Sequence, residues 1–445
     1  MEAIFIVFRE VPLKPICVIN VVGLTPRLLA DAPQLRKLVA SPGFGQCGWR
    51  SPLPAVTATC QATMLTGLAP REHGIVGNGW YYRETQEIRF WQQANSLIQG
   101  KPFYDDFETA NMFWWFNQSS SAKYSATPKP HYGCDGSKVF DILDHTDCQL
   151  VQRLGPFPFF SFWGPRAGLP ASRWIAEASS IVMQEKRPTI TLVYLPHLDY
   201  DFQRWPTRSA ARVAEVDACA ATVIECAQSI GATPIVVSEY GLCSVSRPIH
   251  INRVFRESGW LQVRRGPFGE MLLPGESAVF AVADHQLAHV YIRDANRIDE
   301  VRKKLQAIPG IARVVEPAEL ELDHSRSGEL IALSEPDSWF TYYYWLDDRL
   351  APDFARTVDI HRKPGYDPCE LFMTSKWRAI RRVLQKKLGF RYSMDVIPLD
   401  ATLVKGSHGL HPSDPQDGPL IIGPGNLPAD MASFPDFVRG QLANR

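Results

Sequence analysis

The sequence predicts an α/β sandwich with a mostly parallel central sheet. Short β-branched runs recur at Ile16–Val22, Ile190–Leu195 and Pro234–Ser238, and none shows the alternation of a half-exposed strand. Segments with helical periodicity separate these runs, which is typical of parallel α/β folds. Each run is followed by a polar segment or one that contains Gly or Pro. Ligands of such folds gather at the carboxyl ends of the strands, so we expect the functional site there.

The other elements are expected in chain order as a helix at Pro26–Leu38, a helix at Ser209–Ile230, a strand at His289–Arg293, a helix at Arg297–Gln306, a strand at Ile311–Glu316 and a buried strand at Pro419–Ile422. The β-α-β unit from His289 to Glu316 interrupts the pattern of buried strands. We therefore expect it to form part of a small inserted α+β cap.

Two further segments have a distinctive composition. Trp339–Trp345 (WFTYYYW) is interpreted as an aromatic strand packed under the cap, and a substrate-stacking wall is the alternative. Met373–Gly389 is the one basic stretch. A solvated helix face is the favoured interpretation, with attraction of an anion near the site as the alternative.

Charge and composition exclude several classes of protein. The 445 residues include 47 Lys and Arg and 47 Asp and Glu, and this balance argues against binding to a nucleic-acid polymer. No apolar run reaches the ~18 residues that span a bilayer. The N-terminus lacks a basic segment followed by an apolar one, and the nine cysteines form no CxxC pair. We therefore expect a cytoplasmic protein without a membrane span or a disulfide framework, and its oligomeric state stays open.

The segment Pro54–Asn78 (PAVTATCQATMLTGLAPREHGIVGN) carries the clearest chemical signal. Thr57 follows a short apolar element and precedes a helical pattern at Gln61–Leu65. A hydroxyl near a helix N-terminus lies where backbone N–H groups and the helix dipole favour anions, which suits a nucleophile or a phosphoryl acceptor. The same spacing is typical of a simple helix cap by Thr57 or Thr59, and spacing alone favours the cap.

This segment resembles the nucleophile segment of the alkaline phosphatase superfamily. It is most similar to the nucleotide pyrophosphatase/phosphodiesterase (type I phosphodiesterase) and phosphonoacetate hydrolase branches, which have a threonine at the Thr57 position and an HGI.GN motif at His73–Asn78. Three later segments fall where these branches have metal ligands: Tyr194–Gln203 (YLPHLDYDFQ), Val237–Gly241 (VSEYG) and Gly406–Gly409 (GSHG). At a finer level the chain resembles a bacterial group labelled alkaline phosphodiesterase/nucleotide pyrophosphatase.

The resemblance implies an alkaline-phosphatase-like three-layer α/β/α sandwich. It also implies two divalent metals, usually zinc, which stabilise the attacking and leaving oxygens of an in-line displacement at phosphorus. Thr57 would be the nucleophile and would form a phosphothreonine that water resolves. By the same resemblance, Asp199 and His408 would bind one metal, and Glu239 and Thr57 the other.

The chain departs from the family pattern at several of these positions. Val22 stands where the family has a metal-ligating aspartate, and Gln203 and Tyr240 stand where it has histidines. A neutral amide oxygen is a weak ligand, and a phenol is a poor zinc ligand at neutral pH. Cys60 replaces an asparagine that holds the phosphate oxyanion, and we assign Cys60 and Asn78 to substrate binding. One metal ion, held by Asp199 and His408 with Gln203 as a further ligand, or none is therefore expected rather than two.

Other residues offer replacement ligands. Asn20 shares a strand face with Val22, but about 6.5 Å of strand separates them, so it is a poor substitute. Asp201 would share the face of Asp199 if that strand continued. A structural role is favoured for the spare histidines His250, His285, His289, His361 and His411. A turn is favoured over an anion site for Asp135-Gly136 and the nearby Lys129, His131 and Lys138.

We expect residues 15–280 and 325–430 to form the core and residues 281–324 to form the cap. The favoured function is hydrolysis of a phosphodiester, pyrophosphate or related phosphoryl bond at Thr57, on a small phosphoryl or aromatic substrate. One alternative is a binding protein with a degraded metal site. Another is an enzyme repurposed for a small molecule in secondary metabolism.

Overall fold

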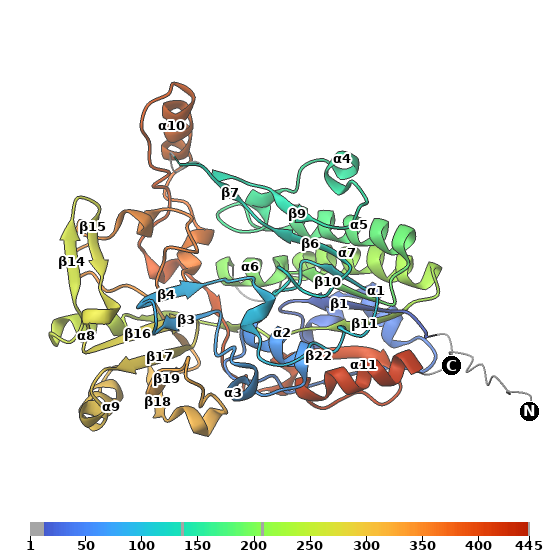
Figure 1. Ribbon diagram of the computed structural model, residues 1–445, viewed down its shortest axis with the longest axis horizontal. Coiled ribbons are helices and arrows are strands. Elements are labelled where there is room, and N and C mark those ends of the chain that lie inside the picture. Colours follow the sequence, from blue (N-terminus) through green and yellow to red (C-terminus); the bar gives the residue numbers. More distant parts are fainter. Residues whose placement is uncertain (1–12, 135–137, 206–208, 444–445) are drawn as a thin grey trace, which may run out of the picture.

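The computed structural model describes residues 13–134, 138–205 and 209–443, and an eight-stranded sheet lies at its centre (Figure 1). In spatial order the strands are β2 (Phe44–Gly48), β22 (Leu420–Pro424), β11 (Thr233–Val237), β1 (Ile16–Val21), β10 (Ile190–Leu195), β5 (Thr109–Met112), β6 (Tyr124–Pro128) and β9 (Ile142–Asp144). The strands from β11 to β6 are parallel, and β2, β22 and β9 are antiparallel to their neighbours. The predicted α/β fold with a mostly parallel sheet is confirmed.

Helices cover both faces of this sheet. On one face α1 (Pro33–Val39), α5 (Leu169–Lys186) and α7 (Ala210–Ser229) pack side by side, and on the other lie α2 (Thr57–Thr66) and α11 (Phe434–Ala443) (Figure 1). Every residue of β1, β10 and β11 is buried as a result. Burial on both faces explains why these strands are apolar runs without alternation.

The single helix predicted at Pro26–Leu38 is wrong, because this segment forms two helices. A 3-10 helix at Pro26–Asp31 ends at Ala32, and α1 begins at Pro33. Proline lacks the N–H that a continuous helix needs, and its ring disfavours helical backbone angles in the residue before it. Ala32 accordingly has φ −117° and ψ 77°.

A second, antiparallel sheet of four strands lies beside the first (Figure 1). It consists of β16 (Val279–Asp284), β17 (Leu287–Ile292), β19 (Leu330–Ser334) and β18 (Ile311–Val315), and α9 (Ile298–Gln306) packs against it. The elements predicted for the β-α-β unit are therefore present, with small shifts at their ends. The division at residues 281–324 stays a prediction.

The aromatic segment Trp339–Trp345 is only partly a strand. The strand β20 covers Ser338–Phe340, and the remaining residues are irregular. All seven side chains are nevertheless buried, and the six aromatic ones belong to the hydrophobic cluster that includes β16 and β17. This burial agrees with packing under the second sheet rather than with an open stacking wall.

The remaining strands and α-helices are α3 (Pro70–His73), β3 (Gly79–Tyr82), β4 (Glu87–Phe90), β7 (His131–Tyr132), β8 (Lys138–Val139), α4 (Leu150–Leu154), α6 (His197–Arg204), β12 (Cys243–Ser244), β13 (Arg247–Ile249), α8 (Ile251–Glu257), β14 (Val263–Gly266), β15 (Gly269–Leu272), α10 (Lys376–Lys387) and β21 (Gly406–Ser407). Among the described residues, no helix combines the length and the apolar character needed to cross a bilayer.

Asp217 on α7 caps the N-terminus of α1, because its carboxylate accepts the N–H groups of Gln34 at 2.9 Å and Leu35 at 2.8 Å. We expect Asp217→Ala to lower the free energy of unfolding by about 1–2 kcal/mol, since two helix N–H groups lose their acceptor. Urea denaturation measures this. Thr222→Ala, at an exposed position of the same helix, should change the value by less than about 0.5 kcal/mol. Equal effects of the two substitutions would contradict the capping role.

Candidate active site

The carboxyl ends of β11, β1 and β10 lie level at one edge of the central sheet. The parallel register pairs Val21, the last residue of β1, with the last residue of β10, and pairs Asn20 with the last residue of β11. The segments that follow β10 and β11 carry Asp199 and Glu239. Sheet register thus brings an amide and two carboxyl side chains to one edge, as the sequence predicted for a ligand site in this fold.

Asp199 lies on a helix, so the strand does not continue in the way that a shared face for Asp199 and Asp201 would require. The strand β10 ends at Leu195, and α6 begins after Pro196. Asp199 and Gln203, four residues apart, face the same side of α6. Asp201 faces another side, where Arg204 contacts its carboxylate at 2.7 Å. The structure therefore does not bring Asp201 beside Asp199 as a second ligand.

Thr57 is the first residue of α2, and the prediction of a simple cap is wrong. The N-cap position is Val56, which makes no side-chain cap. The acceptor for the first turn comes from elsewhere in the chain, because Asn78 Oδ1 accepts the Ala58 N–H at 3.0 Å. The Thr57 hydroxyl lies 2.9 Å from the hydroxyl of Tyr240. The threonine side chain is thus left free of capping and points toward the strand ends.

Glu239 is buried and holds one carboxylate oxygen in a pair of short hydrogen bonds. Its Oε1 accepts Asn20 Nδ2 at 2.5 Å and Gln61 Nε2 at 2.6 Å, while Oε2 has no partner. Burial raises the pKa of Glu239 to about 7, although hydrogen bonds from Gln61 and Asn20 and the nearby Thr57 hydroxyl oppose this shift. One oxygen of a carboxyl group that titrates near neutral pH is therefore available for a ligand or a proton.

Asp199 and His408 face each other with 3.6 Å between Asp199 Oδ1 and His408 Nε2. Burial first, and then the charge of Glu239, raise the pKa of Asp199 well above its usual range. Gln203 Nε2 donates to Asp199 Oδ2 at 2.8 Å, and Gln203 Oε1 accepts the Tyr366 hydroxyl at 2.7 Å. Both polar atoms of Gln203 are engaged, so in this conformation the amide orients Asp199.

The ring of Tyr240 lies flat on the ring of His408, with 3.6 Å between centroids and 7° between planes. His285 packs on His408 at 3.6 Å and on Tyr366 at 3.7 Å. These stacked rings fix His408 between two neighbours. Tyr240 therefore links the nucleophile candidate Thr57 to the histidine.

His408 is held as a neutral imidazole. Its Nδ1 lies 2.8 Å from the carbonyl oxygen of Ala55, which can only accept, so Nδ1 carries the proton. Burial lowers the pKa of His408 to about 3, against a smaller opposing effect of this hydrogen bond. The lone pair therefore resides on Nε2, the nitrogen that faces Asp199.

Asn78 and Cys60, the predicted substrate-binding residues, both lie at α2. Asp284 accepts the Asn78 backbone N–H at 2.7 Å and its side-chain Nδ2 at 3.1 Å, which aims Asn78 Oδ1 at the helix. Burial raises the pKa of Asp284 to about 7. The Cys60 thiol contacts the backbone carbonyl of Glu239 at 3.5 Å. Contact of Cys60 or Asn78 with substrate stays a prediction.

The donor atoms fit one divalent metal. Asp199 Oδ1 is buried without a hydrogen-bond partner, and it faces the unprotonated Nε2 of His408, whose other nitrogen is held by a carbonyl. A carboxylate and an imidazole fixed in this way form a typical metal-ligand pair. Gln203 would be the third ligand by resemblance, if it released Tyr366.

The donor atoms do not fit a second metal. Val22 is apolar and fully buried, and the Tyr240 hydroxyl contacts Thr57. Among the described residues, Glu239 Oε2, the buried and unpartnered Asn20 Oδ1 and the Thr57 hydroxyl remain at this subsite. One carboxylate and two neutral oxygens, with no histidine or cysteine among them, fall short of the ligand set that zinc takes in proteins.

Most of the spare histidines make contacts elsewhere in the structure. His250 bonds Thr341 and His411 bonds the Ser51 carbonyl, while His289 and His361 contact the carbonyls of Val76 and Phe90. His285 alone among the five stacks on His408. Around the predicted turn at Asp135-Gly136, Lys129 bonds Gln118, Lys138 pairs with Asp359 and His131 lies near Asp141. Asp135 and Gly136 themselves lie outside the described residues.

A separate group, His197, Asp201 and Glu215, also gathers possible ligand atoms within 4.8 Å. Arg212 contacts both carboxylates of this group, at 3.7 Å and 3.1 Å. Arginine charges thus already compensate these acids, and we assign no metal to them.

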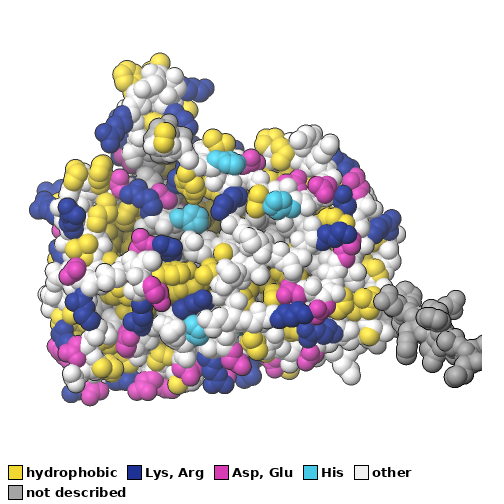
Figure 2. All heavy atoms as spheres, in the orientation of Figure 1, with side chains coloured by type: hydrophobic (Ala, Val, Ile, Leu, Met, Phe, Trp, Pro, Cys, Tyr) yellow, Lys and Arg dark blue, Asp and Glu magenta, His cyan; other side chains and the backbone are white. Residues whose placement is uncertain are grey.

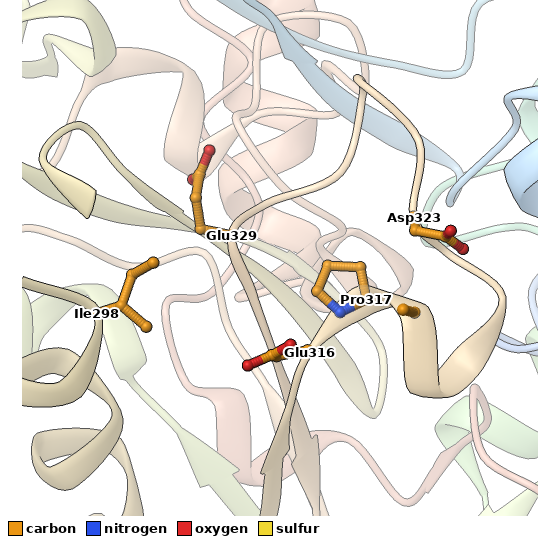
Figure 3. A pocket seen from close by; sticks show the side chains of 6 residues that line it. Ile298, Glu316, Pro317, Asp323 and Glu329 are labelled. Atoms are coloured by element: carbon orange, nitrogen blue, oxygen red, sulfur yellow. The ribbon is translucent and has the colours of Figure 1, made fainter. Parts of the chain in front are cut away.

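A surface cavity of about 350 Å³ lies between α9 and the segment that follows β18 (Figure 3). Three acidic residues, Glu316, Asp323 and Glu329, line it. Their negative charge disfavours a phosphoryl group. The cavity is thus no alternative site for the predicted reaction.

Two residues of the site escaped the sequence analysis. Gln61 bonds Glu239, and Tyr366 bonds Gln203. Gln61 carried a weak signal, because it is a polar residue inside an otherwise small and apolar helical pattern. Tyr366 lies in a turn-rich loop and offered none.

An α/β sandwich with two carboxylates beyond its strand ends, a threonine at a helix N-terminus and a histidine beside them defines an alkaline-phosphatase-like protein. The chain belongs to the type I phosphodiesterase/nucleotide pyrophosphatase family, whose model matches residues 16–367. This confirms the resemblance seen in the sequence. No curated protein matches the chain by sequence.

Solved structures share the fold along almost the whole chain. Phosphonoacetate hydrolase from Sinorhizobium meliloti 1021 is 16% identical, with a TM-score of 0.60, over 97% of this chain and 96% of that one. Murine ectonucleotide pyrophosphatase/phosphodiesterase 5 is 12% identical, with a TM-score of 0.57, over 96% of this chain and 95% of that one. The human protein of the same name has 12% identity and a TM-score of 0.56 over the same shares.

The buried His289 should make stability fall in acid. Burial lowers its pKa to about 4, below the ~6.5 of an unfolded histidine, so the unfolded chain binds more protons between these values. Between about pH 7.5 and 5, the wild type should lose about 2 kcal/mol more unfolding free energy than His289→Gln. Urea titrations at both pH values measure the difference. His145→Gln, at an exposed position, should follow the wild type; a His289→Gln slope equal to that of the wild type would refute the assignment.

Proposed function

We propose that the chain hydrolyses a phosphodiester, pyrophosphate or related phosphoryl bond with Thr57 as the nucleophile. The observation that carries this proposal is the position of the Thr57 hydroxyl. It lies at the start of a ten-residue helix, bonded to Tyr240 and next to a carboxylate with an unpartnered oxygen. The helix N-terminus favours the negative charge of a phosphoryl group at this point.

The chemistry needs a proton acceptor for Thr57, and Glu239 is suited to the role. As the Thr57 oxygen forms a bond to phosphorus, its proton passes to Glu239, and the bond from phosphorus to the leaving oxygen breaks. A pKa of about 7 keeps much of Glu239 ionised, yet basic enough to accept the proton, at neutral pH. Water then cleaves the phosphothreonine, and the Thr57 oxygen recovers a proton.

Asp199 and His408 would hold one divalent metal, which would supply positive charge to the oxygens on phosphorus when bound. Gln203 would keep Asp199 turned toward that ion. Relatives in structure support a phosphoryl substrate. The bacterial hydrolase was solved with phosphonoacetate, and an inactive threonine-to-alanine form of the murine protein was solved with AMP.

A second candidate function is binding without hydrolysis. The observation that favours it is the second metal subsite, where Asn20, Gln61 and Tyr240 make hydrogen bonds in place of coordination. A chain of this kind would still bind a phosphoryl compound at Asp199 and His408. It would show no turnover.

Thr57→Ala should abolish turnover of an activated aryl phosphodiester, by at least about a thousandfold in kcat/KM, because the attacking oxygen is lost. Thr57→Ser should retain part of the activity. Thr59→Ala is the matched control, since its hydroxyl is also buried on α2 but has no partner, and it should behave as the wild type. Activity that survives Thr57→Ala would rule out the nucleophile assignment. Failure of the wild type to turn over any phosphodiester would favour the binding function.

Elemental analysis of the purified chain should find fewer than two tightly bound divalent ions per molecule. His408→Ala should remove the bound ion, whereas His411→Ala, three residues further on, should retain it, because that side chain bonds the Ser51 carbonyl. Val22→Asp combined with Tyr240→His should raise the metal content, since it returns two ligands to the second subsite. Two stoichiometric ions in the wild type would overturn the one-metal site.

A further inference from the structure

The helix α10 stands on an arm that projects from the body of the protein (Figure 1). We call residues 374–394 the arm. At its base, Thr374 donates its backbone N–H to the Val396 carbonyl at 2.8 Å, and Asp395 accepts Arg382 Nε at 2.7 Å. These contacts fix the point where the arm leaves the body. None of the residues of α10 is fully buried, and Ala379 packs against a hydrophobic cluster of the body, so the rest of the chain covers only part of this helix.

One face of α10 is apolar and exposed. Trp377, Ile380, Leu384 and Leu388 are spaced by three or four residues and therefore share a helix face. Their exposed fractions are 80%, 48%, 53% and 70%, and the neighbouring Phe390 is 64% exposed. A tryptophan and a leucine so exposed on a single helix indicate a surface that another body covers.

The arm is also strongly basic. It carries seven Lys and Arg residues and no Asp or Glu, whereas the rest of the chain has 40 Lys and Arg against 47 Asp and Glu. Asp395 at the base pairs with only two of the seven, Arg378 and Arg382. In Figure 2, hydrophobic and basic side chains lie next to one another on this projection. The sequence prediction of a solvated helix face is thus correct for the basic side chains and incomplete for the apolar ones.

We propose that the arm is a docking element for an anionic lipid surface. A helix with Trp and Leu on one face and Lys and Arg around it is suited to the boundary between headgroups and acyl chains. Such a helix lies on a membrane and does not span it, which is consistent with the lack of a spanning helix among the described residues. Because the rest of the chain has a net negative charge, an anionic lipid surface repels the body and attracts only the arm.

A second copy of the chain is the less favoured occupant. A symmetric contact between two α10 faces would bring seven basic residues of one copy toward seven of the other. Repulsion between like charges opposes that contact, and an anionic bilayer meets the same side chains with opposite charge.

Vesicle sedimentation with the full-length chain tests the proposal. We expect the wild type to sediment with vesicles of phosphatidylcholine that contain about one third phosphatidylglycerol, and at least about tenfold less with pure phosphatidylcholine. The combination of Trp377→Gln, Leu384→Gln and Leu388→Gln should remove the sedimentation. Lys376→Gln with Arg381→Gln and Lys386→Gln should weaken it about tenfold or more, and these basic residues make no ion pair at the base of the arm.

The control variant is Phe268→Gln with Leu346→Gln. These two apolar side chains lie on the body and are 51% and 54% exposed. The control variant should sediment as the wild type does. Equal melting temperatures of all variants would show that the fold is intact. Wild type that fails to sediment with anionic vesicles overturns the proposal. A second result would also overturn it: light scattering shows a wild-type dimer, and the Trp377 combination converts this dimer to a monomer without changing lipid binding.

Discussion

The burial of two carboxyl groups, those of Asp199 and Glu239, beyond the ends of the two parallel strands that flank β1 is the constraint on which the site depends. A buried carboxylate is costly unless hydrogen bonds or a cation compensate it. Glu239 receives two amide donors on one oxygen and Asp199 receives one amide, from Gln203. Each acid keeps one oxygen without a hydrogen-bond partner, so the cost of burying its charge is only partly compensated. A metal ion, a proton or a substrate would bind to these two unpaired oxygens.

The departures from the family pattern form one connected set of contacts. With Val22 unable to coordinate, Glu239 turns one oxygen to Asn20 and Gln61. Tyr240 then places its hydroxyl on Thr57 and its ring on His408, where a histidine ligand would stand in the family. Hydrogen bonds thus stand where the family pattern has coordination at one half of the site, and the proposed metal ligands Asp199 and His408 lie at the other half. The loss of a metal ligand therefore does not by itself imply the loss of catalytic activity in this chain.

Much of the fold follows from patterns in the sequence, and the errors have identifiable causes. Strands buried on both faces are continuous apolar runs, so β1, β10 and β11 were predictable. Pro33 divides a helix whose periodicity hides the break. The helix that carries Asp199 is short and almost fully buried, so its pattern cannot be distinguished from that of a strand. The bond between Gln61 and Glu239 joins residues 178 positions apart, and no local pattern encodes such a contact.

The contact between the Thr57 segment and the His408 segment has a consequence for synthesis of the chain. Ala55 and Gly409 form an isolated bridge, and the Ala55 carbonyl also fixes the imidazole of His408. These partners lie 353 residues apart along the chain. A growing polypeptide therefore cannot complete the candidate site until residue 409 has left the ribosome. The Thr57 and His408 segments meet late in synthesis, after the strands and helices between them have been made.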